Sequence, residues 1–362
     1  MNKLLEETIT LRHELHAIPE ASNHEVQTKE HLINFVKEHI ENISQYELVD
    51  CGKWFYVVYK SKNPTQDPIA FRADFDAVTQ DSEHVRHLCG HDGHAATLAG
   101  FCILINGHAL NRDVYFLFQH AEESGEGGKM IAPILAEKHV GEVYAYHNIP
   151  GYPVGQILIR PNTFALASTG LRINFDGHVS HAAYPELGAN PAFAIGKLLE
   201  RLEAFNKKEK DYIEFATVVG ISLGNDSFGV SAGNGHLSVT VRSEKEENLH
   251  GLVQELKDLS ESLAKEYQLE AKFEMVEPFP ATYNYPEAID KITSACKTAH
   301  LKYSNLEEPF RWSEDFGYYT KLAKGAMVGV GDGEDSTFLH TDTYHFNDEL
   351  IIYVWLFFAS LL

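Results

Sequence analysis

Strand-like apolar runs alternate with helix-like segments between residues 4 and 146 of this 362-residue chain. Apolar residues recur at helical spacing over 4–15 and 25–40, and 95–105 is a small, apolar, helix-prone run. The strand-like runs are 54–59, 68–72, 114–118 and 143–146. Such alternation is typical of a mostly parallel sheet covered by helices on both faces. We therefore expect an α/β fold.

The segment 168–277 has a different element order. A strand over 171–175 precedes a helix that begins after Asn190-Pro191, a capping pair. Two strands, a long helix and a last strand follow at 215–223, 236–241, 249–263 and 269–276. This order, βαββαβ, predicts a compact ferredoxin-like module. Because 362 residues exceed what one core usually fills, we predict a first domain of 1–167 and 278–362 with 168–277 inserted in it.

Charge and hydropathy restrict the classes of partner. The formal net charge is −22, and no basic stripe suits a polyanion, so we expect no nucleic-acid partner. The C-terminal run 350–362 has no charged residue but is too short to span a bilayer. A buried closing helix is predicted there, and no membrane association is expected.

The cysteines bear on the cellular compartment. Cys51, Cys89, Cys102 and Cys296 form no CxxC pair, although they could form two disulfides in a secreted protein. Residues 1–7 contain acidic side chains before any long apolar run, unlike a signal peptide. We expect reduced thiols and a cytoplasmic location.

Metal-competent side chains follow the strand-like runs. Two adjacent glutamates, Glu122 and Glu123, follow 114–118, and such a pair is costly to bury without a cation. The other members are Asp74 and Asp76 after 68–72, Cys89 and His91 in the segment His87–His94, His147 after 143–146, and His340 beyond 326–330. The carboxyl ends of parallel strands meet at one sheet edge, where ligands bind. The pattern predicts a metal-dependent hydrolase.

Each of these residues also fits an ordinary role when taken alone. Aspartates form turns, a glutamate pair can be solvated, and the chain contains 20 histidines. The shared placement at strand ends favours the metal site. His87, Asp92 and His94 are expected to support the ligands rather than to bind the metal.

Seven motifs in chain order resemble those of the N-acyl-amino-acid amidohydrolases, which include aminoacylases, hippurate hydrolases, acetyl-diaminopimelate deacetylases and auxin-conjugate hydrolases. This group is a branch of the carboxypeptidase G-type metallopeptidases. The motifs are LRHELH at 11–16, RADFDA at 72–77, CGHDGH at 89–94, FQHAEE at 118–123, GHVSHAA at 177–183, SEDFG at 313–317 and Leu339-His340.

The resemblance implies two divalent metal ions per chain, Zn or Mn in the first place, with Co or Ni also compatible with the ligand types. The implied ligands are Cys89, His91, Glu123, His147 and His340. A hydroxide held by the two ions would attack the amide of an N-acyl amino acid, with Glu122 as general base and Asp76 in support.

The same resemblance makes 168–277 a lid domain that commonly mediates a homodimer. His181 in this lid would polarise the scissile carbonyl and contact substrate, and Arg242 would hold a substrate carboxylate. Alternatively, Arg242 is only a solvent-exposed residue at the end of a strand and binds no substrate. The segment Phe228–Ser231 departs from the family's usual Asn-Val/Ile-Ile-Pro element, so the substrate pocket is atypical.

Two other functions stay open at this point. A dipeptidase or carboxypeptidase of the same group would use the same metal ligands. A catalytically degenerate protein that binds acyl amino acids would keep the ligands without turnover, and the altered lid strand favours that alternative.

Overall fold

The computed structural model describes residues 2–80, 84–225 and 227–362, which form two compact units. Unit 1 comprises 1–164, 282–309 and 315–362, and unit 2 comprises 165–281 and 310–314. The boundaries predicted at 167/168 and 277/278 lie a few residues from these limits. The short return of 310–314 to unit 2 was not predicted, because it carries no periodic pattern.

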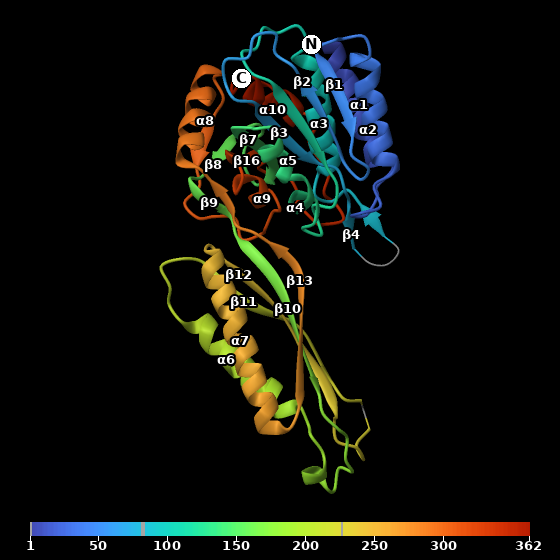
Figure 1. The fold of residues 1–362 in the computed structure, drawn as a ribbon, viewed down its shortest axis with the longest axis vertical. Coiled ribbons are helices and arrows are strands. Elements are labelled where there is room, and N and C mark those ends of the chain that lie inside the picture. Colours follow the sequence, from blue (N-terminus) through green and yellow to red (C-terminus); the bar gives the residue numbers. More distant parts are fainter. Residues whose placement is uncertain (1, 81–83, 226) are drawn as a thin grey trace. The chain divides into compact units, whose positions relative to one another are not determined.

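Unit 1 is built on a sheet of eight strands (Figure 1). In spatial order they are β1 (Tyr46–Asp50), β2 (Phe55–Tyr59), β6 (Val114–Gln119), β3 (Ile69–Asp74), β7 (Glu142–Pro150), β16 (Lys324–Gly333), β8 (Ile157–Ile159) and β15 (Tyr303–Asn305). The inner strands β6, β3, β7 and β16 are parallel, as predicted. Antiparallel pairing joins β1 to β2, β2 to β6 and β16 to β8. The parallel strands read as continuous apolar runs because both faces are covered, and every residue of β3 is buried.

The larger helices of unit 1 share one core with the sheet. They are α1 (Asn2–His16), α2 (Gln27–Ile40), α3 (His91–Leu104), α8 (Pro286–Thr298) and α10 (Leu350–Ala359). Alternate strand residues such as Phe55, Phe71 and Phe116 pack into this core. The predicted closing helix is confirmed as α10, whose Trp355 is 1% exposed. Among the described residues, no helix combines the length and apolar character needed to cross a bilayer.

Shorter elements complete unit 1. They are β4 (Val78–Thr79), β5 (Val85–Arg86), α4 (Gly127–Ile131), α5 (Pro133–Glu137), β9 (Asn162–Ala165), β14 (Thr282–Asn284) and α9 (Gly317–Thr320). The helix predicted over 95–105 begins earlier, at His91. The Cys/His motif therefore forms the entry and first turn of α3 rather than a loop before it.

Unit 2 has the predicted element order βαββαβ, and its helices α6 and α7 lie on one face of a four-stranded antiparallel sheet (Figure 1). The elements are β10 (Ala167–Asp176), the 3-10 turn η1 (Pro185–Leu187), α6 (Ala192–Lys207), β11 (Glu214–Leu223), β12 (Asn234–Ser243), α7 (Glu246–Tyr267) and β13 (Glu270–Phe279). The spatial strand order is β11-β12-β10-β13, which leaves β11 at an edge. The predicted cap is present, since Oδ1 of Asn190 accepts the N–H of Ala192 at 2.9 Å.

Candidate metal centre

Asp76 lies just beyond the end of β3 and is completely buried. Its Oδ1 accepts a hydrogen bond from Nδ1 of His91 at 3.1 Å. Its Oδ2 accepts from Oγ of Ser22 at 2.7 Å and from the N–H of Glu123 at 3.0 Å. Burial alone would raise the pKa of Asp76, but these donors hold it below its usual range. Asp76 is therefore an ionised carboxylate that fixes two predicted ligand segments.

The entry to α3 places Cys89 and His91 together. Gly90 between them has φ = +94°, and a Cβ there would lie 2.9 Å from the side-chain amide of Asn148. Position 90 therefore requires glycine, because of its positive φ and because there is no room for a Cβ. His91 is completely buried, and its Nδ1 is held by Asp76. Among the residues that the structure describes, Nε2 of His91 has no hydrogen-bond partner.

Both glutamates after β6 face this nitrogen. Nε2 of His91 lies 3.8 Å from Oε1 of Glu123 and 4.0 Å from Oε2 of Glu122. Oε1 of Glu123 is buried without a hydrogen-bond partner in the described part of the chain, and Nε2 of His340 lies 3.6 Å from it. His340 is placed by its own N–H, which donates to the carbonyl of Leu88 at 2.8 Å.

His147 lies within β7 and is buried. Its Nδ1 lies 2.9 Å from the carbonyl of Asn148, which can only accept, so this nitrogen is the donor. In the neutral ring, Nε2 then carries a lone pair. Sγ of Cys89 lies 3.5 Å from Nε2. A metal-binding histidine usually donates its second ring N–H to a carbonyl or a carboxylate, and His147 does so to the carbonyl of Asn148.

Among the described residues, five groups of three side chains could hold a metal ion, because the ligand atoms in each group lie within 4.8 Å of one another. Two of the groups contain Asp74, with His91 and His94 or with Glu122 and Glu314. The other three are Cys89 with His91 and His147; Cys89 with Glu123 and His340; and His91 with Glu122 and Glu123. Shared members link the three groups into one cluster in unit 1. The sequence prediction placed the same side chains at one sheet edge.

The electrostatics of the cluster favour a bound cation. Burial, together with the charges of Asp76 and Asp74, raises the pKa of Glu123 to about 7 against the opposing effect of His91. Burial raises the pKa of the Cys89 thiol well above its usual range. Burial lowers the pKa of His91, but Asp74, Cys89 and Asp76 raise it well above its usual range. The surroundings thus favour positive charge, and the unpartnered Nε2 of His91 and Oε1 of Glu123 fit metal ligands.

A buried charge network beside the cluster was not predicted. Arg72 is 1% exposed and donates to Oδ2 of Asp74 at 2.5 Å and to Oδ1 of Asp315 at 2.7 Å. Gln119 also donates to Asp315, at 2.7 and 2.8 Å. His94 lies 2.6 Å from Oδ1 of Asp74, consistent with its expected supporting role. The motifs that contain Arg72 and Asp315 were visible in the sequence, but nothing in them indicates this pairing.

Asp92 and His87 are the other two supporting residues predicted from the segment His87–His94. Asp92 contacts α1. Its Oδ2 lies 2.7 Å from Nδ1 of His16. His87 is buried, and neither ring nitrogen has a hydrogen-bond partner among the described residues.

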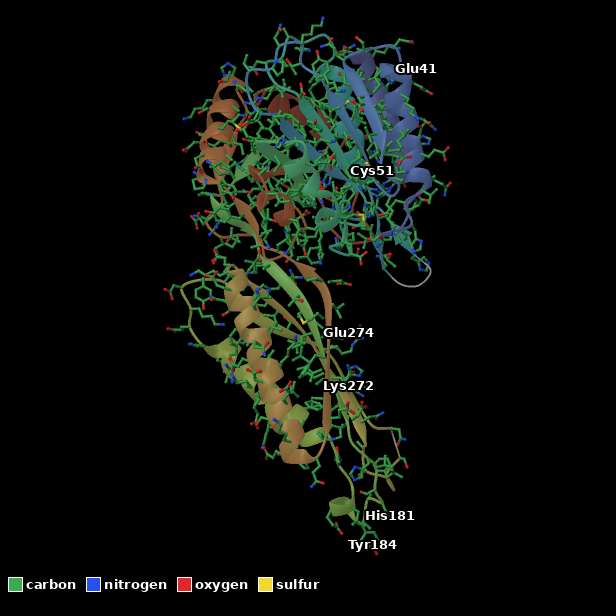
Figure 2. The ribbon with its side chains drawn as sticks, viewed as in Figure 1. Glu41, Cys51, His181, Tyr184, Lys272 and Glu274 are labelled. Atoms are coloured by element: carbon green, nitrogen blue, oxygen red, sulfur yellow. The ribbon has the colours of Figure 1, made fainter. Side chains whose placement is uncertain are left out.

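The predicted residues His181 and Arg242 belong to unit 2. His181 and Tyr184 lie at the end of this unit farthest from where β10 begins (Figure 2). Nδ1 of His181 accepts the N–H of Ala183 at 3.1 Å, so the neutral ring carries its proton on Nε2. The atypical segment Phe228–Ser231 packs beside it, since His181 forms a β-bridge with Val230.

Arg242 lies near the end of β12 and is half-buried. Its Nη1 donates to the carbonyl of Arg311 at 3.0 Å and to Oγ of Ser313 at 2.9 Å. It lines a cavity of about 230 Å³ on the sheet of unit 2, together with Ser168, Arg172, Ser238 and Thr240. Arg242 is thus held by two hydrogen bonds beside a cavity that apolar side chains, among them Leu171, Val239 and Phe279, also line.

Comparison with known proteins gives consistent matches. The family described as Peptidase family M20/M25/M40 matches residues 70–362. An uncharacterized hydrolase of Staphylococcus saprophyticus is 27% identical over 372 residues, covering 97% of this chain and 95% of the relative. The N-acetyldiaminopimelate deacetylase of Bacillus subtilis is 26% identical over 342 residues, covering 90% of each chain. The solved structure of Bacillus subtilis YXEP, described as a dinuclear metal binding peptidase, shares the fold with a TM-score of 0.82 at 22% identity, covering 100% of this chain and 98% of that one.

Proposed function

Since this chain belongs to peptidase family M20/M25/M40, a family of hydrolases, we propose that it is a metal-dependent amidohydrolase that cleaves an N-acyl amino acid or a similar small amide. The observation that carries this proposal is the convergence of a thiol, three imidazoles and two carboxylates within one cluster. The name of the Bacillus subtilis relative indicates that an N-acetylated amino acid is the first substrate to test.

Two divalent ions would be held by Cys89, His91, Glu123, His147 and His340. The thiol and imidazoles suit Zn, and the mixed nitrogen and oxygen donors also admit Mn, Co or Ni. When bound, the ions would supply Lewis acidity that activates a water and polarises the amide carbonyl. The orphaned atoms on His91 and Glu123 support this assignment.

Glu122 would act as the general base. It is 5% exposed; its Oε1 accepts the N–H of Asp315 at 3.3 Å, and its Oε2 faces the ring of His91. This anchoring would hold the carboxylate where it can take the proton of the attacking water and pass it to the departing amine. Asp76 would support the chemistry by fixing His91 and the backbone of Glu123.

Unit 2 would supply substrate contacts as a lid. His181 presents Nε2–H as a donor, which suits polarisation of the scissile carbonyl. Arg242, with hydroxyl groups around it, suits a substrate carboxylate. We also propose a homodimer through the exposed edge of β11, where Val219, Ile221 and Leu223 are 62%, 49% and 43% exposed. We further propose a cytoplasmic location, as the sequence predicts.

A substrate panel tests the proposed activity. The protein, supplied with Mn²⁺ or Zn²⁺, is incubated with acetyl and benzoyl amino acids and with dipeptides, and the products are identified by mass spectrometry. Release of free amino acid from acyl substrates would support the proposal. Cleavage of dipeptides alone would identify a dipeptidase or carboxypeptidase. Tight binding of an acyl amino acid without turnover would identify the degenerate binding protein, which the altered segment Phe228–Ser231 favours.

A further inference from the structure

The turn after β6 has an unfavourable backbone conformation and carries both glutamates of the cluster. Ala121 has φ = +50° and is completely buried. Residues with a Cβ seldom adopt this left-handed region, and such conformations persist only where the surroundings enforce them. The carbonyl of Ala121 accepts the N–H groups of Glu126 and Gly127 at 3.2 and 3.0 Å, which closes the turn. The directions of Glu122 and Glu123 therefore depend on a conformation that alanine does not favour.

Glu25 holds this turn from a distant part of the chain. It precedes α2, is 5% exposed, and its Oε1 accepts the N–H of Ala121 at 2.7 Å. A buried N–H without an acceptor is strongly disfavoured, so this bond stabilises the observed conformation over its alternatives. Asp76 fixes the turn at a second point, because its Oδ2 accepts the N–H of Glu123, two residues after Ala121. Glu25 and Asp76 thus fix the backbone on both sides of Glu122.

We propose that Glu25 is a positioning residue that keeps Ala121 in its left-handed conformation and thereby directs Glu122 and Glu123 into the cluster. Glu25 itself is not placed among the metal ligands or the groups that touch substrate. The expected effect of Glu25 on metal binding rests on the proposed function. The stabilisation of the turn by Glu25 does not rest on it. Two measurements on the metal-free protein separate these two claims.

Hydrogen exchange tests the hold on the turn. Glu25→Met removes the acceptor, Glu25→Gln keeps a carbonyl oxygen in the same place, and Glu30→Met removes an exposed acid from the same region as a matched control. We expect amide exchange of 121–127 to quicken about tenfold or more in Glu25→Met, because a buried hydrogen bond is lost. Exchange in the other two variants should match the wild type. Unchanged exchange in Glu25→Met would overturn the proposal.

Titration with Mn²⁺ tests the consequence for the cluster. Loss of a supporting group usually weakens metal binding about 10- to 100-fold, and we expect this for Glu25→Met but not for Glu25→Gln. Glycine adopts positive φ readily, so Ala121→Gly combined with Glu25→Met should recover most of the affinity. A purely global role for Glu25 would not be rescued at Ala121, and a double variant no better than Glu25→Met would overturn the proposal.

Two further outcomes, a Glu25→Met variant that does not fold and a wild type that binds no metal, also test the proposals. If Glu25→Met does not fold, restored folding of the double variant supports the proposal, and an unfolded double variant overturns it. If the wild type binds neither Mn²⁺ nor Zn²⁺, the proposed metal-dependent function fails. The exchange measurement then still decides whether Glu25 holds the turn.

Discussion

Oδ1 of Asp76 lies 3.1 Å from Nδ1 of His91, and both side chains are completely buried. Because an ionised carboxylate only accepts, Nδ1 carries the proton and Nε2 is left facing the carboxylate of Glu123 at 3.8 Å. One side chain thus sets both the tautomer and the direction of a proposed metal ligand. The same carboxylate holds the backbone of Glu123.

Replacement of Asp76 by Asn should therefore weaken metal binding. The neutral amide cannot accept from His91, Ser22 and the N–H of Glu123 as the carboxylate does, and we expect the affinity for Mn²⁺ to fall about 10- to 100-fold. Titration of the metal-free protein measures the change. The exposed Asp290 supplies the control, because Asp290→Asn should bind as the wild type does. Equal affinity in Asp76→Asn would show that Asp76 does not orient the ligands.

The two adjacent glutamates should respond differently to the same substitution. In Glu122→Gln, we expect kcat to fall about 10²- to 10⁴-fold, because a general base is lost, while metal content stays near that of the wild type. In Glu123→Gln, metal content itself should fall, because a charged ligand is lost. Metal analysis after dialysis and turnover on the best acyl substrate separate the two. Retained turnover in Glu122→Gln would refute the assignment of the base.

Arg72 should be essential for stability. Its side chain is 1% exposed and neutralises Asp74 and Asp315, whose side chains are both completely buried. Removal of one partner from a buried ion pair typically costs about 3–5 kcal/mol, so Arg72→Met should lower the free energy of unfolding by about that amount. The exposed pair Lys207–Glu203 gives the control, where Lys207→Ala should cost under about 1 kcal/mol. Urea unfolding measures both, and similar losses would contradict the prediction.

Glu25 should make the stability of the metal-free protein depend on pH. Burial, with the nearby charge of Asp76, raises its pKa from 4.5 to about 7. Between these values the folded protein holds a proton that the unfolded chain releases, so stability falls as pH rises. Glu25→Gln lacks this titration. The stability of Glu25→Gln relative to the wild type should therefore increase from pH 4.5 to about 7 and then level off, by about 3 kcal/mol at most. A difference that does not vary with pH would exclude the effect.

The edge of β11 should govern oligomeric state. Val219→Lys combined with Ile221→Lys places two charges on the exposed side chains of β11, an edge strand, and charged side chains on an edge strand oppose edge-to-edge pairing. We expect a wild-type dimer and a monomeric variant in size-exclusion chromatography with light scattering, with an unchanged unfolding midpoint. Leu322 in unit 1 is 48% exposed, and Leu322→Lys should remain dimeric. A monomeric wild type would end the dimer proposal.

The sequence predicted much of the cluster because its signals are local. Glu123 and His147 lie at or just beyond the ends of apolar runs, and parallel strands bring such ends to one edge. Cys89 and His91 form a compact motif at the entry to α3. The same periodicity predicted the element order of unit 2 and the closing helix. It did not predict the short strands β8 and β15 or the antiparallel pairing of β2, because runs of three to five residues do not reveal their partners.

The groups that hold the cluster in place were decided by tertiary structure. Arg72 meets Asp315 across 243 positions of sequence, and Glu25 meets Ala121 across 96. No residue type or spacing encodes such a pairing, because it exists only after the sheet and helices have packed. The sequence by itself determined which side chains can bind a metal and which strand ends present them. Asp76 was expected in a supporting role, but only the packed chain decided that it holds His91 and the backbone of Glu123, since a buried hydrogen bond depends on the approach of distant segments.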